Sequence, residues 1–219
     1  EMTKAGLHWN LAIMRPGGQP LANLAGALLD TELWTGRQPP SPLELETALA
    51  RSDLGLVAAA RHTRMPQNEN LLVVVDQFEE LFRFSASQSE RSTRDEAAAF
   101  VNLLLEAARQ DQVSIYVVLT MRSDFFGDCS QFEDLADAIN KGEYLVPRLT
   151  RDQKKQAIEG PVKVGGATIS PRLIQRLLGD VGDDPDQLPI MQHALMRTWD
   201  HWAADHAEDS PREIANPEL

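Results

Sequence analysis

Three carboxylates follow an apolar run in the middle of the sequence. Leu71 to Val75 (LLVVV) predicts a strand buried on both faces of a parallel sheet, and Asp76, Glu79 and Glu80 come directly after it. In an open parallel sheet, ligands collect at the carboxyl ends of the strands. An Asp at that place can hold a Mg²⁺ that bridges nucleotide phosphates, and an acid a few residues on can polarise the attacking water.

These acids have a second interpretation. A helix N-terminus favours Asp and Glu because the helix macrodipole places partial positive charge there. Asp76, Glu79 and Glu80 would then only open a helix. The spacing by itself does not separate the two interpretations, so both stay open at this point.

A cation ends a second apolar run. Ser114 to Leu119 (SIYVVL) predicts another buried strand, and it leads into Thr120-Met121-Arg122. Beside the Asp76 strand, Arg122 would face the γ-phosphate and stabilise developing negative charge. The alternative is a surface arginine that pairs with Asp124 or Asp128.

Strand and helix patterns alternate as far as Val146, as expected for an α/β fold with a parallel sheet. The predicted strands are Leu7 to Met14, Leu71 to Val75, Ser114 to Leu119 and a short one at Tyr144 to Val146. The predicted helices are Leu21 to Leu33, one opened by Ser41-Pro42-Leu43-Glu44, and one opened by Thr93-Arg94-Asp95-Glu96 that runs through Ala108.

The rest of the chain carries helix signals and no strand-like run. These signals are the capping box Thr150-Arg151-Asp152-Gln153, the helix start Ser170-Pro171 and the helical pattern from Asp186 to Trp202. The sequence therefore predicts an open parallel sheet followed by an all-helical lid. We divide it into a core of residues 1–148, a lid of residues 149–204 and a polar tail of residues 205–219.

Composition narrows the classes of partner. Lys and Arg number 21 against 33 Asp and Glu, a formal net charge of −12, which argues against nucleic acid and anionic membranes as partners. Cys129 is the only cysteine, so no intramolecular disulfide is expected and a reducing, cytoplasmic compartment is inferred. We interpret Cys129 as a small buried residue.

The sequence shows neither a membrane span nor a metal site. No apolar run approaches the roughly 18 residues that span a bilayer. The five histidines lack metal-ligand spacing.

Several stretches together resemble a known family. They are LLVVVDQFEELF, VVLTMRSDFF, YLVPRLTRDQ with AIEGP, and DQLPIMQHALMRTW. In this combination the chain looks like the bacterial novel STAND NTPases, members of the additional-strand, catalytic-Glu (ASCE) branch of P-loop ATPases that are related to the NB-ARC ATPases. The opening LHWNLAIMRPGGQPLANLAGALL resembles the segment after that family's P-loop helix, so the resemblance runs from about His8 to Trp202. It implies an AAA-like open parallel sheet of the P-loop NTPase type with a helical lid.

The resemblance also implies roles for single residues. Asp76 matches the Walker B aspartate, which holds the metal. Glu79 and Glu80 match the paired acids of the family's extended Walker B, one of which would activate water. Arg122 matches the sensor arginine that closes a Thr-x-Arg motif. Pro189 matches the proline of the GxP element in the lid, which contacts the nucleotide.

Two features depart from the family pattern. Gln187 stands where the GxP element has its glycine. The phosphate-gripping G-x-x-x-x-G-K-[ST] does not occur, because Gly17-Gly18 and Gly165-Gly166 lack a following Lys-Ser or Lys-Thr, and we interpret both pairs as turns. The family's first strand and P-loop would lie just before Glu1. The sequence leaves open whether the loop is upstream, is disordered, or is lost in a rearranged fragment.

The function implied by the resemblance is a switch that binds ATP or GTP with Mg²⁺ and hydrolyses it slowly. Such domains are fused between an effector domain and a repeat-built sensor, and they assemble when activated. Without the phosphate loop, we expect this fragment alone to bind nucleotide weakly or not at all. A second hypothesis is a nucleotide-incompetent scaffold or protein-interaction module that works through its helical tail. A third is an unrelated hydrolase that uses Asp76 and Glu80 with another metal.

Overall fold

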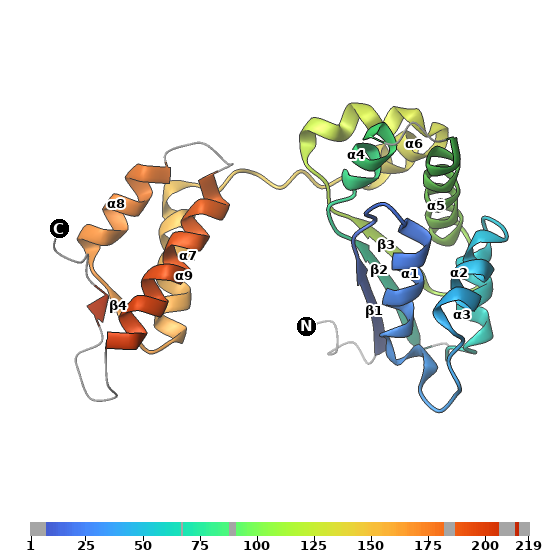
Figure 1. Cartoon of the computed structure of the whole chain (residues 1–219), viewed down its shortest axis with the longest axis horizontal. Helices are drawn as coiled ribbons and strands as arrows, with labels where there is room; N and C mark the ends of the chain where they lie inside the picture. The colour runs from blue at the N-terminus through green and yellow to red at the C-terminus, as the bar shows by residue number, and fades with distance from the viewer. Residues whose placement is uncertain (1–7, 67, 88–90, 182–186, 206–212, 215–219) are drawn as a thin grey trace. The chain divides into compact units, whose positions relative to one another are not determined.

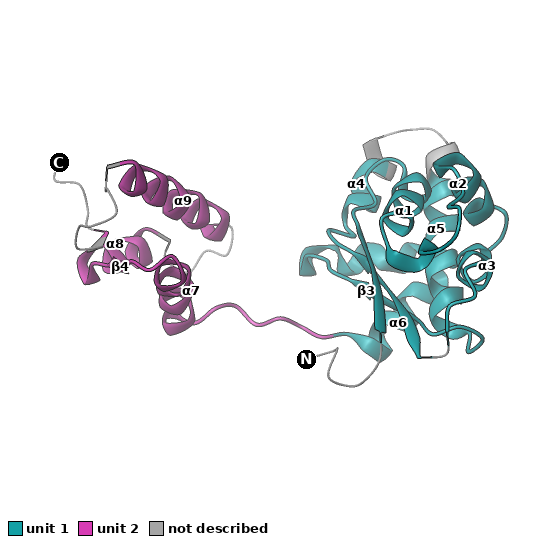
Figure 2. Ribbon diagram, turned by 90° about the horizontal axis from the view of Figure 1, so that it is seen from below, with its two compact units in different colours: residues 1–143 teal, residues 144–219 magenta. Residues whose placement is uncertain are grey.

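The computed structural model describes residues 8–66, 68–87, 91–181, 187–205 and 213–214 of the 219-residue chain. The chain divides into two compact units, Glu1–Glu143 and Tyr144–Leu219 (Figure 2). Each unit buries its own apolar residues, so each has a core of its own. Within the described ranges, none of the helices combines the length and the apolar character that crossing a bilayer would require.

The sheet of unit 1 has three parallel strands in the order β1-β2-β3. They are β1 (His8–Met14), β2 (Glu69–Val75) and β3 (Ile115–Leu119), which confirms the first three of the four predicted strands (Figure 1). Met14 pairs with Val75, and Val75 pairs with Leu119. All three strands therefore end in register, and the residues that follow them meet at one edge of the sheet.

Helices connect the strands of unit 1. They are α1 (Pro20–Leu29), the 3₁₀ turn η2 (Glu32–Trp34), α2 (Pro42–Ala50), α3 (Gly55–His62), α4 (Glu80–Ser87), α5 (Arg91–Arg109), the 3₁₀ stretch η3 (Ser123–Gln131) and α6 (Glu133–Gly142). The predicted capping box of α2 is confirmed, because Ser41 Oγ accepts from the Glu44 N–H at 3.3 Å and the Glu44 carboxylate accepts from the Ser41 N–H at 2.8 Å.

Two predicted helix boundaries are wrong. The first helix ends at Leu29 rather than Leu33, because Thr31 caps a separate 3₁₀ turn by accepting from the Leu33 N–H at 3.4 Å. Helix α5 begins at Arg91, so Thr93 lies inside its first turn instead of capping it. A Thr-x-x-Glu spacing fits a helix interior as well as a helix start, and neither Arg nor Ser upstream of it stops a helix.

One face of the sheet is buried beneath helices. Val73 and Val75 of β2 have no exposed surface, and neither do Leu24 of α1 and Phe100 of α5. Helix α1 contacts β1, and α5 contacts β3. Burial of each such large apolar side chain contributes about 1.5–3 kcal/mol, so this core fixes the strands relative to one another.

The other face of the sheet is apolar and largely uncovered by described residues. On it, Leu11 and Ile13 of β1 are 49% and 60% exposed, and Tyr116 and Val118 of β3 are 51% and 45% exposed. The β2 residues between them are half-buried. The prediction that β2 is buried on both faces is therefore wrong for this chain, because the described helices that contact the sheet bury its opposite face.

Residues 143–150 form an exposed connecting segment without strand pairing. Tyr144, Leu145 and Val146 are 83%, 72% and 75% exposed, so the short strand predicted there is wrong. The run has strand-forming residues, but a strand also needs a neighbour that pairs with its backbone donors and acceptors. No described strand lies alongside it.

Unit 2 is mainly helical. Its elements are α7 (Arg151–Val164), β4 (Thr168–Ile169), α8 (Pro171–Val181), α9 (Leu188–Asp205) and β5 (Glu213–Ile214). The capping box at Thr150 and Gln153 and the helix start at Pro171 are confirmed. The all-helical prediction is wrong in one detail, because β4 and β5 form a two-stranded parallel sheet too short to show a periodic pattern. Residues 206–212 and 215–219 of the predicted polar tail lie outside the described residues.

Candidate functional site

Thr120 organises the edge of the sheet where β2 and β3 end. Its Oγ1 donates to Asp76 Oδ1 at 2.7 Å and accepts from the Gln77 N–H at 3.1 Å, while its carbonyl accepts from the Phe78 N–H at 2.9 Å. Gln77 adopts a φ of 53°, a left-handed conformation that costs about 1 kcal/mol or more in a non-glycine residue. The hydrogen bonds to Thr120 hold this tight bend, which directly follows Asp76.

The Asp76 carboxylate lies between a hydroxyl and a guanidinium. Its Oδ1 accepts from Thr120, and its Oδ2 accepts from Arg15 Nε at 3.2 Å. The hydrogen bond from Thr120 is the largest cause that lowers the pKa of Asp76 below its usual value; partial burial opposes it and Arg15 adds to it. Asp76 is therefore ionised at neutral pH and presents a carboxylate at the strand ends.

The two neighbouring glutamates lie in different environments. Glu80 begins α4, is half-exposed, and accepts from the Gly17 N–H through Oε2 at 3.2 Å. Gly17 belongs to the loop after β1, so Glu80 reaches across the same edge of the sheet that carries Asp76. The second interpretation of these acids, that they open a helix, is correct for Glu80, because Glu80 occupies the first turn of α4.

Glu79 is buried instead. It is 7% exposed, and its Oε2 has no hydrogen-bond partner among the described residues. Phe78, which precedes it, is fully buried and makes an edge-to-face contact with Phe82 at 5.6 Å between ring centroids. A buried carboxylate oxygen without a partner is costly, and such groups are rare in folded proteins.

Arg122 pairs with a nearby acid. Its Nε and Nη2 donate to Asp124 Oδ2 at 3.2 and 2.7 Å, and both side chains are at least half exposed. The hydrogen bond from Arg122 lowers the pKa of Asp124. The geometry matches the surface pairing named above as the alternative, and a role in phosphate sensing requires Arg122 to exchange Asp124 for the phosphate.

The loop after β1 adds residues that sequence reasoning missed. Arg15 directly follows β1 and reaches Asp76, and Asn23 Nδ2 of α1 holds the loop by donating to the carbonyls of Arg15 and Pro16 at 3.2 and 2.9 Å. Gly17 has a φ of 55°, which a glycine adopts freely. The signal was present, because Arg15 follows a predicted parallel strand just as Asp76 does. The pairs Gly17-Gly18 and Gly165-Gly166 both form turns, as predicted.

The acids at this edge fit a site for Mg²⁺ that depends on a nucleotide. Mg²⁺ is usually held by one or two carboxylates together with phosphate oxygens and water. Asp76 supplies an ionised carboxylate at the strand ends, and no cluster of three or more potential ligands occurs among the described residues. The chain thus presents a partial ligand set of the kind that substrate phosphates complete.

The remaining candidates have structural roles or lie apart from this edge. Cys129 is 1% exposed, as predicted, and burial is the largest cause that raises the pKa of its thiol. Trp199 and Trp202 of unit 2 contact each other with ring centroids 5.3 Å apart, as expected of packing residues. Pro189 lies exposed in the first turn of α9, in unit 2, whereas the other predicted site residues belong to unit 1.

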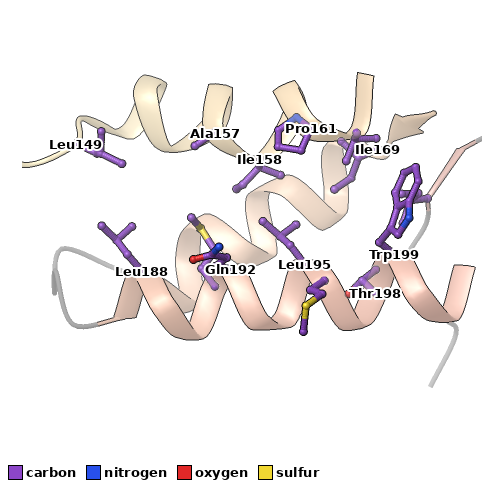
Figure 3. Close-up of a pocket in the computed structure, with 14 residues that line it drawn as sticks. Leu149, Ala157, Ile158, Pro161, Ile169, Leu188, Gln192, Leu195, Thr198 and Trp199 are labelled. Carbon is purple, nitrogen blue, oxygen red and sulfur yellow. The ribbon is translucent and has the colours of Figure 1, made fainter. Parts of the chain in front are cut away.

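An apolar groove of about 590 Å³ lies within unit 2 between α7 and α9 (Figure 3). Side chains from both helices line it, among them Pro161, Leu188, Leu195 and Trp199. Its described lining is mainly apolar and contains no ionisable side chain.

The described residues form an open parallel sheet with helices on one face, followed by a mainly helical unit, an α/β architecture consistent with the predicted P-loop NTPase fold of the AAA-like type. More particularly, the chain belongs to the family described as Novel STAND NTPase 1, whose sequence profile matches residues 1–210. No curated protein sequence matches the chain. Among solved structures it is similar to the AAA domain of FIGL-1, with 14% sequence identity, a TM-score of 0.45, and coverage of 95% of this chain and 67% of that chain.

Proposed function

We infer that this chain is the Walker B and sensor part of a nucleotide switch that binds Mg²⁺ with ATP or GTP and hydrolyses the nucleotide slowly. The observation that carries this proposal is the position of Asp76. An ionised carboxylate stands at the carboxyl edge of a parallel sheet, fixed by Thr120 of the neighbouring strand. That edge is where ligands bind in open α/β sheets.

The side chains at this edge would divide the work of phosphoryl transfer. Asp76 would hold the metal, which supplies charge neutralisation at the phosphates. Glu80 would orient and polarise the attacking water, because it is accessible to solvent and already accepts a hydrogen bond from the Gly17 N–H at the same edge. Arg122 would pair with the γ-phosphate in place of Asp124, and Pro189 would contact the nucleotide from the helical unit.

In this proposal, a phosphate-binding loop from outside the described residues would complete the site. The uncovered apolar face of Leu11, Ile13, Tyr116 and Val118, together with the outer edge of β3, offers the surface on which a further strand and helix would pack. We place the loop between that strand and helix, upstream of Glu1. The chain alone would then bind nucleotide weakly, because backbone amides of such a loop supply most phosphate contacts.

Nucleotide state would set the arrangement of the two units and so transmit a signal. The connecting segment 143–150, which is exposed and has no strand pairing, would act as the hinge in this rearrangement. The partners in this proposal are the nucleotide, effector and repeat-built sensor domains fused to this chain, and further copies in a nucleotide-dependent oligomer.

Nucleotide binding and turnover by the full-length protein, including any residues upstream of Glu1, test this function. We expect binding of Mg²⁺-ATP or Mg²⁺-GTP and turnover slower than about 1 s⁻¹, below the usual range of enzymes. Asp76→Asn should abolish turnover and weaken metal-dependent binding. Asp53→Asn, a change at an exposed aspartate before α3, is the matched control and should leave both unchanged. Absence of binding at millimolar nucleotide would overturn the proposal.

The apolar groove of unit 2 favours a second candidate, a protein-interaction module that does not use nucleotide. A groove between two helices that is lined by apolar side chains is a typical binding site for an amphipathic helix. Partner binding distinguishes the two candidate functions. If the chain is a protein-interaction module, Leu195→Glu in the groove would abolish partner binding, whereas Asp76→Asn would leave partner binding intact.

A further inference from the structure

Arg15 forms an ion pair with Asp76, the proposed metal ligand. It directly follows β1, and the Asp76 N–H donates to the Met14 carbonyl at 2.8 Å, which ties the two strand ends together. Its Nε donates to Asp76 Oδ2 at 3.2 Å. We propose that Arg15 competes with the divalent metal for Asp76 and, once displaced, binds a phosphate oxygen of the nucleotide. This inference rests on the proposed function.

The competition follows from the partners of the carboxylate. Thr120 occupies Oδ1 and Arg15 occupies Oδ2, so each oxygen already accepts a hydrogen bond. A metal that takes Oδ2, directly or through water, meets the positive charge of the guanidinium. The two cations repel each other, so each one weakens the binding of the other at Oδ2.

Arg15 is free to move while its backbone stays in place. Its side chain is 59% exposed, and among the described residues its guanidinium makes one hydrogen bond, through Nε. Its carbonyl accepts from Asn23, and Glu80 holds the neighbouring Gly17. A swing of the side chain therefore leaves the loop intact.

The chemistry of the guanidinium suits the second partner. In the described part of the chain, the two terminal amino groups of Arg15 make no hydrogen bond. A guanidinium matches the oxygens of a phosphate with two parallel hydrogen bonds. Nucleotide phosphates that reach a metal at Asp76 lie within the same edge of the sheet. Arg15 would thus lower the affinity of the site for metal alone and raise its affinity for the metal–nucleotide complex.

These opposite effects separate the proposal from a purely structural ion pair. In the full-length protein, Mn²⁺ binding without nucleotide is measured by electron paramagnetic resonance, and binding of a fluorescent ATP analogue with Mg²⁺ by anisotropy. Arg15→Ala should strengthen Mn²⁺ binding by up to about fivefold, the range set by an exposed ion pair. The same variant should weaken nucleotide binding by at least about tenfold through loss of charged hydrogen bonds.

Two further variants complete the experiment. Arg15→Gln removes the charge with a smaller loss of volume, and it should show the same opposite effects if Arg15→Ala does not fold. Arg51→Ala, at an exposed arginine after α2, is the control and should change neither affinity. Unchanged affinities in the Arg15 variants, or a change of both in the same direction, would overturn this inference alone. Failure of the wild-type protein to bind nucleotide would overturn the proposed function and this inference with it.

Discussion

Thr120 Oγ1 donates a hydrogen bond to Asp76 Oδ1 at 2.7 Å and thereby joins the ends of two neighbouring parallel strands. The same hydroxyl accepts a hydrogen bond from the Gln77 N–H. One side chain therefore both stabilises the ionised form of the Asp76 carboxylate and holds the bend after it. This relationship makes Thr120 the residue on which the geometry of the proposed site depends most directly.

Thr120→Val should raise the pKa of Asp76 toward its ordinary value of 3.8, because the largest cause of its lowering is lost. A lowered carboxyl pKa stabilises the fold above the unfolded pKa, and this stabilisation is lost as pH falls through the folded pKa. The variant should therefore be less stable than wild type at neutral pH, by about 0.5–1.5 kcal/mol, because the exposed Gln77 N–H can still bond to water. The difference should shrink at about pH 3. Urea unfolding at both pH values measures it.

Thr120→Ser is the matched control for that change, because it keeps the hydroxyl. Its Asp76 should retain the low pKa in a carboxyl ¹³C NMR titration. An unchanged Asp76 pKa in Thr120→Val would contradict the assigned cause.

Glu80→Gln and Glu79→Gln should affect the full-length protein differently. If Glu80 polarises the attacking water, its amide should reduce nucleotide turnover by about 100-fold or more and leave nucleotide binding in place. Glu79→Gln should keep most of the turnover and should not lower thermal stability, since it removes a buried carboxylate whose Oε2 has no described partner. Steady-state turnover and thermal melts check both. A loss of turnover confined to Glu79→Gln would exchange the two roles.

The double change Ile13→Thr and Val118→Thr tests the uncovered face of the sheet. In the 219-residue chain it should lower the binding of a hydrophobic dye and change the free energy of unfolding by less than about 1 kcal/mol, because both side chains are largely exposed. In the full-length protein we expect it to destabilise by about 1–3 kcal/mol, because a further helix would cover this face. Val73→Thr, on the fully buried face, should destabilise both forms. Equal, small effects of the double change in both forms would argue against the covering segment.

Two glycines of unit 1 should respond in opposite ways to alanine. At Gly26, inside α1, a Cβ would meet nothing within 4 Å, so Gly26→Ala should stabilise the chain by about 0.5–1 kcal/mol through helix propensity. At Gly55, the first residue of α3, a Cβ would collide with the backbone carbonyls of Ala48 and Leu49. Gly55→Ala should therefore destabilise by about 1–3 kcal/mol. Chemical denaturation of the two variants side by side measures both signs.

Much of unit 1 was predictable from the sequence because its signals are local. The apolar runs that became β1, β2 and β3 are each flanked by turn or polar residues, and the Ser41 capping box acts over three residues. Family membership, too, rests on stretches that are contiguous in the sequence. The local signal was misleading at Tyr144 to Val146. These residues have strand-forming side chains, but no described strand lies beside them to pair with their backbone.

The sequence by itself determined the three strands of unit 1, the starts of α2, α7 and α8, and the position of three acids after a strand. Only the tertiary structure placed Arg15 beside Asp76, because these residues are 61 positions apart and meet through the register of β1 and β2. It also gave the adjacent residues Glu79 and Glu80 opposite environments, one buried and one half-exposed. The physical reason is the same in both cases. Periodicity and capping depend on neighbours along the chain, whereas burial, register and the partners of a charge depend on segments that packing brings together.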